Sequence, residues 1–121
     1  MPEYVIHDEP LVGALERLDV QAYIDNVTDE WLNQTLCQVD NTLVRLGVLQ
    51  GEYHWHQHDD EDEFFFVLSG HMRIELEDRD PVDLGQGSAF IVPKGLRHRP
   101  ICPTRTAVLM LERVGVTPTG D

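Results

Sequence analysis

Two histidines separated by a single residue, His56 and His58, have types and spacing that could bind a metal ion. In an extended segment, residues two apart project from the same face, so both imidazoles can reach one ion. Glu63 follows after an acidic segment at 59–62 that can turn the chain, and its carboxylate would add an oxygen ligand. Nitrogen and oxygen ligands without a thiolate suit Fe, Mn, Ni, Cu or Zn. We therefore predict one divalent transition metal per chain.

His54 offers a competing register, because it is also separated by one residue from His56. In that register Glu61 would be the carboxylate, and Leu68 rather than Gly70 would stand at the turn that follows the next strand. The spacing to Gly70 favours the first register. His54 is then expected to support the ligands or to line the cavity.

Two blocks of this sequence resemble the paired signature motifs of the cupin family. The first runs from Trp55 to Gly70, the second runs from Val92 to Pro100, and the resemblance is dense over residues 43–112. In cupins the first motif supplies two histidines and a glutamate, and the second supplies another histidine. The resemblance thus implies a jelly-roll barrel, a double-stranded β-helix, with a metal in its mouth held by His56, His58, Glu63 and His98.

The sequence departs from the family pattern at two positions. Four residues rather than the usual five separate Gly51 from His56, and Cys102 stands where the second motif usually has asparagine. Cys102 is expected near the cavity as a buried small hydrophobic residue, and a reactive thiol is the alternative. The segment Thr119-Gly120-Asp121 also resembles a subgroup of single-barrel cupins often labelled mannose-6-phosphate-isomerase-like.

Many short strand-like stretches separated by turn residues predict an all-β barrel. The stretches are 36–39, 42–49, 64–68, 72–76, 82–84, 89–92, a segment around His98, and 106–111. Residues 64–68 are apolar on both faces of their strand. If Phe65 faces the interior with Glu63, then Phe64, Phe66 and Leu68 face outward and need a cover. A homodimer is the favoured cover, and residues 1–30 of the same chain are the alternative.

Residues 1–30 are predicted to form a partly helical segment that packs on the barrel or on a partner, and residues 31–121 to form the barrel. Pro10 follows two acidic residues, as in the first turn of a helix. Leucines at 11, 15 and 18 then recur at helical spacing. The apolar residues at 20, 23, 24 and 27 predict a second short helix.

Composition excludes several classes of partner. Twenty-two acidic residues against nine basic ones give a net charge of −13, which disfavours nucleic acids and anionic membranes. No apolar run approaches the roughly 20 residues that cross a bilayer, and residues 1–4 do not resemble a secretory signal. Two cysteines suit a reducing compartment, so we expect a cytoplasmic protein.

The leading functional prediction is a metal-binding cupin that acts on a small oxygen-rich molecule, with isomerase-like or dioxygenase-like chemistry. Sugar isomerisation needs a general base in addition to the metal, and the motifs do not identify one. The alternative is a non-catalytic barrel that binds a small molecule or a metal. Barrels of one fold host many chemistries, so the ligand set alone does not choose between these functions.

Overall fold

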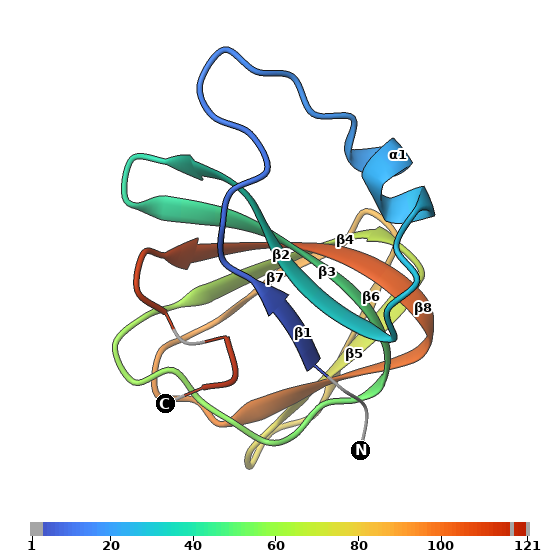
Figure 1. Cartoon of the computed structure of the whole chain (residues 1–121). Helices are drawn as coiled ribbons and strands as arrows, with labels where there is room; N and C mark the ends of the chain where they lie inside the picture. The colour runs from blue at the N-terminus through green and yellow to red at the C-terminus, as the bar shows by residue number, and fades with distance from the viewer. Residues whose placement is uncertain (1–3, 117, 121) are drawn as a thin grey trace.

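Turn residues divide the chain into strands that wrap around a common interior (Figure 1). The computed structural model describes residues 4–116 and 118–120. One helix, α1 (Val20–Asp25), lies between the first two strands. The strands are β1 (Tyr4–His7), β2 (Trp31–Val39), β3 (Thr42–Glu52), β4 (Glu63–Ser69), β5 (His71–Leu76), β6 (Val82–Gly85), β7 (Ala89–Val92) and β8 (His98–Arg113). The prediction of an all-β jelly roll with a short N-terminal helix is confirmed.

The long strand β8 joins the parts of the barrel. Its C-terminal half pairs antiparallel with β3 on one side and with β4 on the other. Its N-terminal half pairs with β5, which in turn pairs with β6. The prediction of separate segments around His98 and at 106–111 is wrong, because β8 runs without interruption from one to the other. A single strand therefore connects the second motif to the centre of the sheet.

Alternation along the strands creates two hydrophobic clusters, one on each face of the sheet. The inner cluster fills the barrel and includes Phe65, Val67 and Val108. The outer cluster is built on Leu46 and Val48 and is packed against side chains of α1 and the residues before it. The prediction for β4 is confirmed on both faces of the strand. Phe65 and Val67 are buried, and the side chains that alternate with them are only partly buried. Residues from the N-terminal segment therefore cover part of the outer face.

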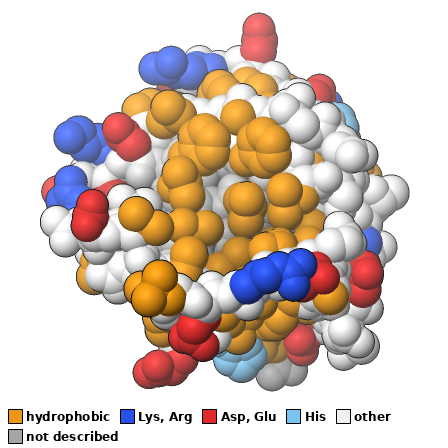
Figure 2. Space-filling view, turned by 90° about the horizontal axis from the view of Figure 1, so that it is seen from above, with side chains coloured by type: hydrophobic (Ala, Val, Ile, Leu, Met, Phe, Trp, Pro, Cys, Tyr) orange, Lys and Arg blue, Asp and Glu red, His pale blue; other side chains and the backbone are white. Residues whose placement is uncertain are grey.

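Part of this outer face remains open. Leu68 belongs to the covered cluster, whereas Ile91 and Leu111 are 56% and 37% exposed. Both are cross-strand partners of Phe64, so the three side chains form one apolar strip. Figure 2 looks down on the molecule from above and shows hydrophobic side chains gathered in a broad hollow bordered by charged ones.

The N-terminal segment differs from the prediction in its first part. The predicted helix at Pro10 is absent, and the only described helix is α1, which matches the second predicted helix. Leu15 has a φ of 66° and is fully exposed, which is incompatible with a helix whose leucines pack inward. The backbone N–H groups of Leu11 and Val12 instead donate to the carbonyl of Leu36 in β2. Pairing with an existing strand thus replaces local helix formation.

In the described part of the chain, no helix has the length and apolar character needed to cross a membrane.

Gly70, at the turn between β4 and β5, is expected to be required for stability. Its φ is +89°, and a Cβ there would lie 2.5 Å from Oγ1 of Thr106 and 2.7 Å from the carbonyl oxygen of Arg105. Gly70→Ala should lower the free energy of unfolding by at least about 2 kcal/mol, through backbone strain and the forced displacement of β8. Urea denaturation measures this change.

Gly85→Ala is the matched control for that experiment, because no atom lies within 4 Å of the added Cβ. Its effect should stay within about 0.5 kcal/mol. Equal stability of the two variants would show that the turn at Gly70 relaxes without cost.

Candidate metal centre

Backbone hydrogen bonds bring the two motifs together. The N–H of His56 donates to the carbonyl of His98 over 2.9 Å, and the N–H of His98 donates to the carbonyl of His56 over 2.8 Å. The N–H of Gly95 also donates to the carbonyl of His58. The extended segment around His56 forms a single bridge to β8 rather than a full strand. This pairing positions ligands that are 40 residues apart in the sequence.

The four side chains predicted as ligands lie together inside the barrel. One donor atom from each of His56, His58, Glu63 and His98 falls within a group whose members are all within 4.8 Å of one another. Glu63 Oε1 is 3.6 Å from His58 Nε2 and 3.4 Å from His98 Nε2. Glu63 reaches this position as the first residue of β4, and His98 as the first residue of β8.

Hydrogen bonds to the backbone set the tautomers of two of the histidines. Nδ1 of His56 lies 3.0 Å from the carbonyl of His54, and Nδ1 of His98 lies 2.9 Å from the carbonyl of Leu96. A carbonyl only accepts, so in the neutral ring each Nδ1 carries the proton. The Nε2 lone pairs are then available to an ion, which is the usual arrangement of metal-binding histidines.

This donor set fits a divalent metal. Neighbouring ligands around an ion with bonds of about 2.1 Å are about 3 Å apart, so small side-chain movements would close the cluster on an ion. Oε1 of Glu63 and Nε2 of His98 are buried without a hydrogen-bond partner among the described residues. Such atoms are costly to bury unless something binds them, and a cation would satisfy both. Three nitrogens and one oxygen match the transition metals predicted from the sequence.

The pKa values of two of these residues are shifted in directions that favour metal binding. Burial lowers the pKa of His56 to about 4, so its imidazole is neutral at physiological pH. Burial alone would raise the pKa of Glu63, but the contacts with His58 and His98 outweigh it and hold that pKa well below its usual range. The site thus offers a neutral imidazole and a carboxylate at pH 7.

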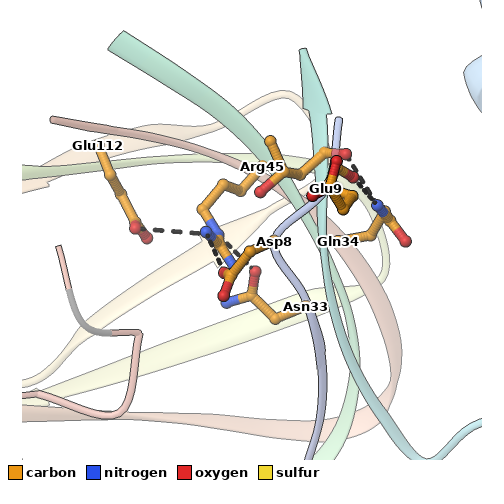
Figure 3. Close-up of polar contacts among 7 residues, drawn as sticks. Asp8, Glu9, Asn33, Gln34, Arg45 and Glu112 are labelled. Carbon is orange, nitrogen blue, oxygen red and sulfur yellow. Dashed lines mark hydrogen bonds and ion pairs between the residues drawn. The ribbon is translucent and has the colours of Figure 1, made fainter. Parts of the chain in front are cut away.

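Figure 3 shows a buried contact between an arginine and a glutamate that the sequence reasoning missed. Arg45 is 1% exposed, and its Nε lies 3.9 Å from Glu112, which is 2% exposed. Arg45 also donates to Oδ1 of Asn33 over 2.6 Å and to Asp8 over 3.3 Å. Burial, followed by the charge of Glu63, raises the pKa of Glu112 to about 9. The raised pKa favours the protonated, neutral form of Glu112 beside the ionised Glu63.

A pattern signal for this pair existed in the sequence. Arg45 interrupts an apolar stretch at an inward-facing position of β3, and Glu112 ends β8 in the same alternation as Val108 and Met110. Charged residues on an inward face are rarely buried unless they are paired. The pairing itself, however, follows only from the register of β3 against β8.

The remaining predicted site residues lie close to the cluster. His54 donates from Nε2 to the carbonyl of Thr119 over 2.8 Å, and its ring lies 5.4 Å from that of His56. Phe65 is 3% exposed, with its ring 6.4 Å from that of His98. Cys102 is fully buried in the inner cluster, and burial raises its pKa to about 12. This environment favours the small hydrophobic residue over the reactive thiol.

A pocket that opens to solvent reaches the cluster at His56 and Glu63. The rings of Tyr4, Trp31 and Tyr53 form much of its wall, and no motif indicated them. Residues 118–120 close another side, because Pro118 lines the pocket and a Cβ on Gly120 would lie 2.6 Å from Cβ of His56. Asp121, the last residue of the segment resembling the isomerase-like subgroup, lies outside the described residues.

Comparisons with known proteins agree with this geometry. Residues 43–113 match the cupin domain family. The chain is 36% identical over 91 residues to YdbB, an uncharacterized protein of Bacillus subtilis strain 168, covering 75% of this chain and 80% of that one. A crystal structure of a cupin-2 domain containing protein from Shewanella frigidimarina has a TM-score of 0.75 at 24% identity, covering 79% of this chain and 93% of that one.

A second solved structure with the same fold belongs to an enzyme. Hydroquinone 1,2-dioxygenase from Sphingomonas sp. TTNP3, crystallised with 4-hydroxybenzoate, has a TM-score of 0.72 at 18% identity. The match covers 83% of this chain and 32% of that one. At this identity the likeness concerns the fold.

The titration of His56 tests the electrostatics of the metal-free site. Because burial disfavours the imidazolium, the His56 ring should stay neutral as the pH falls through 6.5 and gain its proton near pH 4. NMR titration of the ring resonances measures this pKa, with the urea-denatured chain as the control titrating near about 6.5. A native His56 that titrates near 6.5 would contradict the buried environment.

Proposed function

This chain belongs to the cupin domain family, and from that membership and the geometry of the cluster we propose that it holds one divalent transition metal and uses it to act on a small oxygen-bearing molecule. The observation that carries the proposal is the convergence of His56, His58, Glu63 and His98 on one point beside a pocket. When bound, the ion supplies Lewis acidity or redox chemistry. The family match confirms the resemblance inferred from the two motifs.

The residues of the chain have defined roles in this proposal. The three imidazoles and one carboxylate would hold the ion, and a metal that accepts more than four ligands could also bind a substrate. Glu112 helps to lower the pKa of Glu63, and the carbonyls of His54 and Leu96 orient two of the imidazoles. Such supporting contacts typically change metal affinity by about 10- to 100-fold when removed.

The pocket supports dioxygenase-like chemistry over isomerase-like chemistry. A sugar isomerase needs a residue that removes a proton from carbon, and that residue must be a base near pH 7. Among the described residues that line the pocket, the titratable ones are the two ligands His56 and Glu63 and the phenols Tyr4 and Tyr53. Burial raises the pKa of both phenols, so they remain protonated. A dioxygenase with the same fold supports this proposal, because it shows that such a barrel can host dioxygenase chemistry.

Metal content and turnover test the proposal together. Protein stripped with a chelator and reloaded with Fe²⁺, Mn²⁺, Ni²⁺, Cu²⁺ or Zn²⁺ should retain about one ion per chain by elemental analysis. His56→Ala, His58→Ala and His98→Ala should each fall well below stoichiometric binding, because each loses one of four ligands. Oxygen consumption with phenolics, and product analysis with keto acids and sugars, then measure turnover by the loaded protein.

His54→Ala is the matched control, since its backbone carbonyl, which orients His56, is retained. It should keep the ion. Full occupancy in any of the three ligand variants would contradict the ligand set. Bound metal without turnover of any compound would instead support the alternative, a non-catalytic binding barrel.

We also propose that the protein is a homodimer located in the cytoplasm. The N-terminal segment covers Leu68 but leaves the strip formed by Phe64, Ile91 and Leu111 open beside the edge strand β7. A second copy that presents the same strip would bury both. Two copies of a chain with a net charge of −13 repel each other through their charged surfaces. They would therefore associate through the apolar strip.

Light scattering coupled to size exclusion should give twice the chain mass of 13.9 kDa at micromolar concentration. Ile91→Asp should give the monomer mass, because it places a charge in the strip. Val39→Asp is the control, since Val39 is similarly exposed, at 58%, but lies at the end of β2. A wild-type chain at the monomer mass would overturn the dimer.

A further inference from the structure

Four aromatic side chains, together with several aliphatic ones, line the pocket beside the metal cluster. The centroid of the Tyr53 ring lies 4.6 Å from that of Tyr4, 5.1 Å from that of Trp31 and 5.2 Å from that of His56. Phe65 lines the same pocket from β4. The rings come from four separate segments, and together they form a continuous aromatic surface that ends at a metal ligand.

Polar groups in this wall are few. The side-chain oxygen of Asn33 already accepts from Arg45. Nε1 of Trp31 is buried and has no hydrogen-bond partner among the described residues, so it can donate to a ligand oxygen. A sugar brings several hydroxyl groups, and each one buried without a partner costs free energy. The largely apolar wall therefore disfavours polyhydroxylated molecules, while Nε1 of Trp31 can donate to a ligand oxygen.

We propose that the pocket binds a small aromatic compound carrying an oxygen donor, such as a phenol or an aryl carboxylate. This proposal rests on the proposed function, since the oxygen would bind the metal held by His56, His58, Glu63 and His98. The ring of the compound packs against Tyr4, Trp31, Tyr53 and Phe65 in edge-to-face or offset contacts, which stabilise aromatic pairs beyond the area they bury.

Paired ligands of equal size and charge test the proposal on zinc-loaded protein, in which no redox turnover occurs. Benzoate and cyclohexanecarboxylate both carry a carboxylate for the metal, but only benzoate carries an aromatic ring. Gluconate adds the same carboxylate to a polyhydroxylated chain. Calorimetric titration should show benzoate binding about tenfold more tightly than cyclohexanecarboxylate, with gluconate the weakest.

Substitutions of single side chains test which part of the protein produces the preference for benzoate. Tyr53→Leu and Tyr4→Leu should each reduce the preference for benzoate severalfold while zinc stays at one ion per chain, which also shows that the variant is folded. Tyr23→Leu is the matched control, because Tyr23 lies in α1 within the outer cluster, and it should keep the full preference. An unchanged preference in both pocket variants would overturn the assignment of the ring to this wall.

The outcomes separate this proposal from the proposed function. Zinc bound at one ion per chain, with equal affinity for benzoate and cyclohexanecarboxylate or with tighter binding of gluconate, would overturn the aromatic specificity alone. Absence of zinc from the wild-type protein would overturn both proposals. Tenfold selectivity that is lost from zinc-free protein would support the placement of the ligand oxygen on the metal.

Discussion

The two hydrogen bonds exchanged between the backbones of His56 and His98 are the constraint on which the site depends. Residues 53–58 form no strand apart from this bridge, so their position is determined by β8. β8 in turn pairs with β3, β4 and β5, which attaches the ligands to most of the barrel. A shift of one residue in this pairing would turn the imidazoles away from Glu63, because neighbouring residues face opposite sides. The metal centre is thus a consequence of strand register.

Charge balance inside the barrel follows from the same register. Glu63 keeps its charge between two histidines, while Glu112 stays neutral behind it and Arg45 is paired with Asp8 at the surface. A buried charge without such compensation would destabilise the fold by several kcal/mol. A bound cation would satisfy ligand atoms that otherwise lie buried close to one another. Metal binding would therefore stabilise the fold. Changes behind the site are therefore transmitted to the ligands through Glu63.

The pocket draws its walls from distant parts of the chain. Tyr4 comes from β1, Trp31 from β2 and Phe65 from β4, and Pro118 approaches from the opposite end. The ligand set is a property of the cupin family, whereas these walls decide which molecules can reach it. Fold and candidate metal site therefore indicate a class of chemistry, whereas the proposed aromatic specificity rests on the lining of the pocket.

The sequence by itself determined the fold and grouped the four candidate ligands, because ligand spacing and strand alternation are local patterns that survive in the folded chain. His56, His58 and Glu63 lie within eight residues, whereas His98 and the jelly-roll barrel were implied by the resemblance of two separate motifs to the cupin family. Only the tertiary structure decided the rest. The helix expected at Pro10 gave way to pairing with β2, and Arg45 met Glu112 through strand register. Both depend on contacts between residues far apart in the chain, whose partners no local pattern specifies.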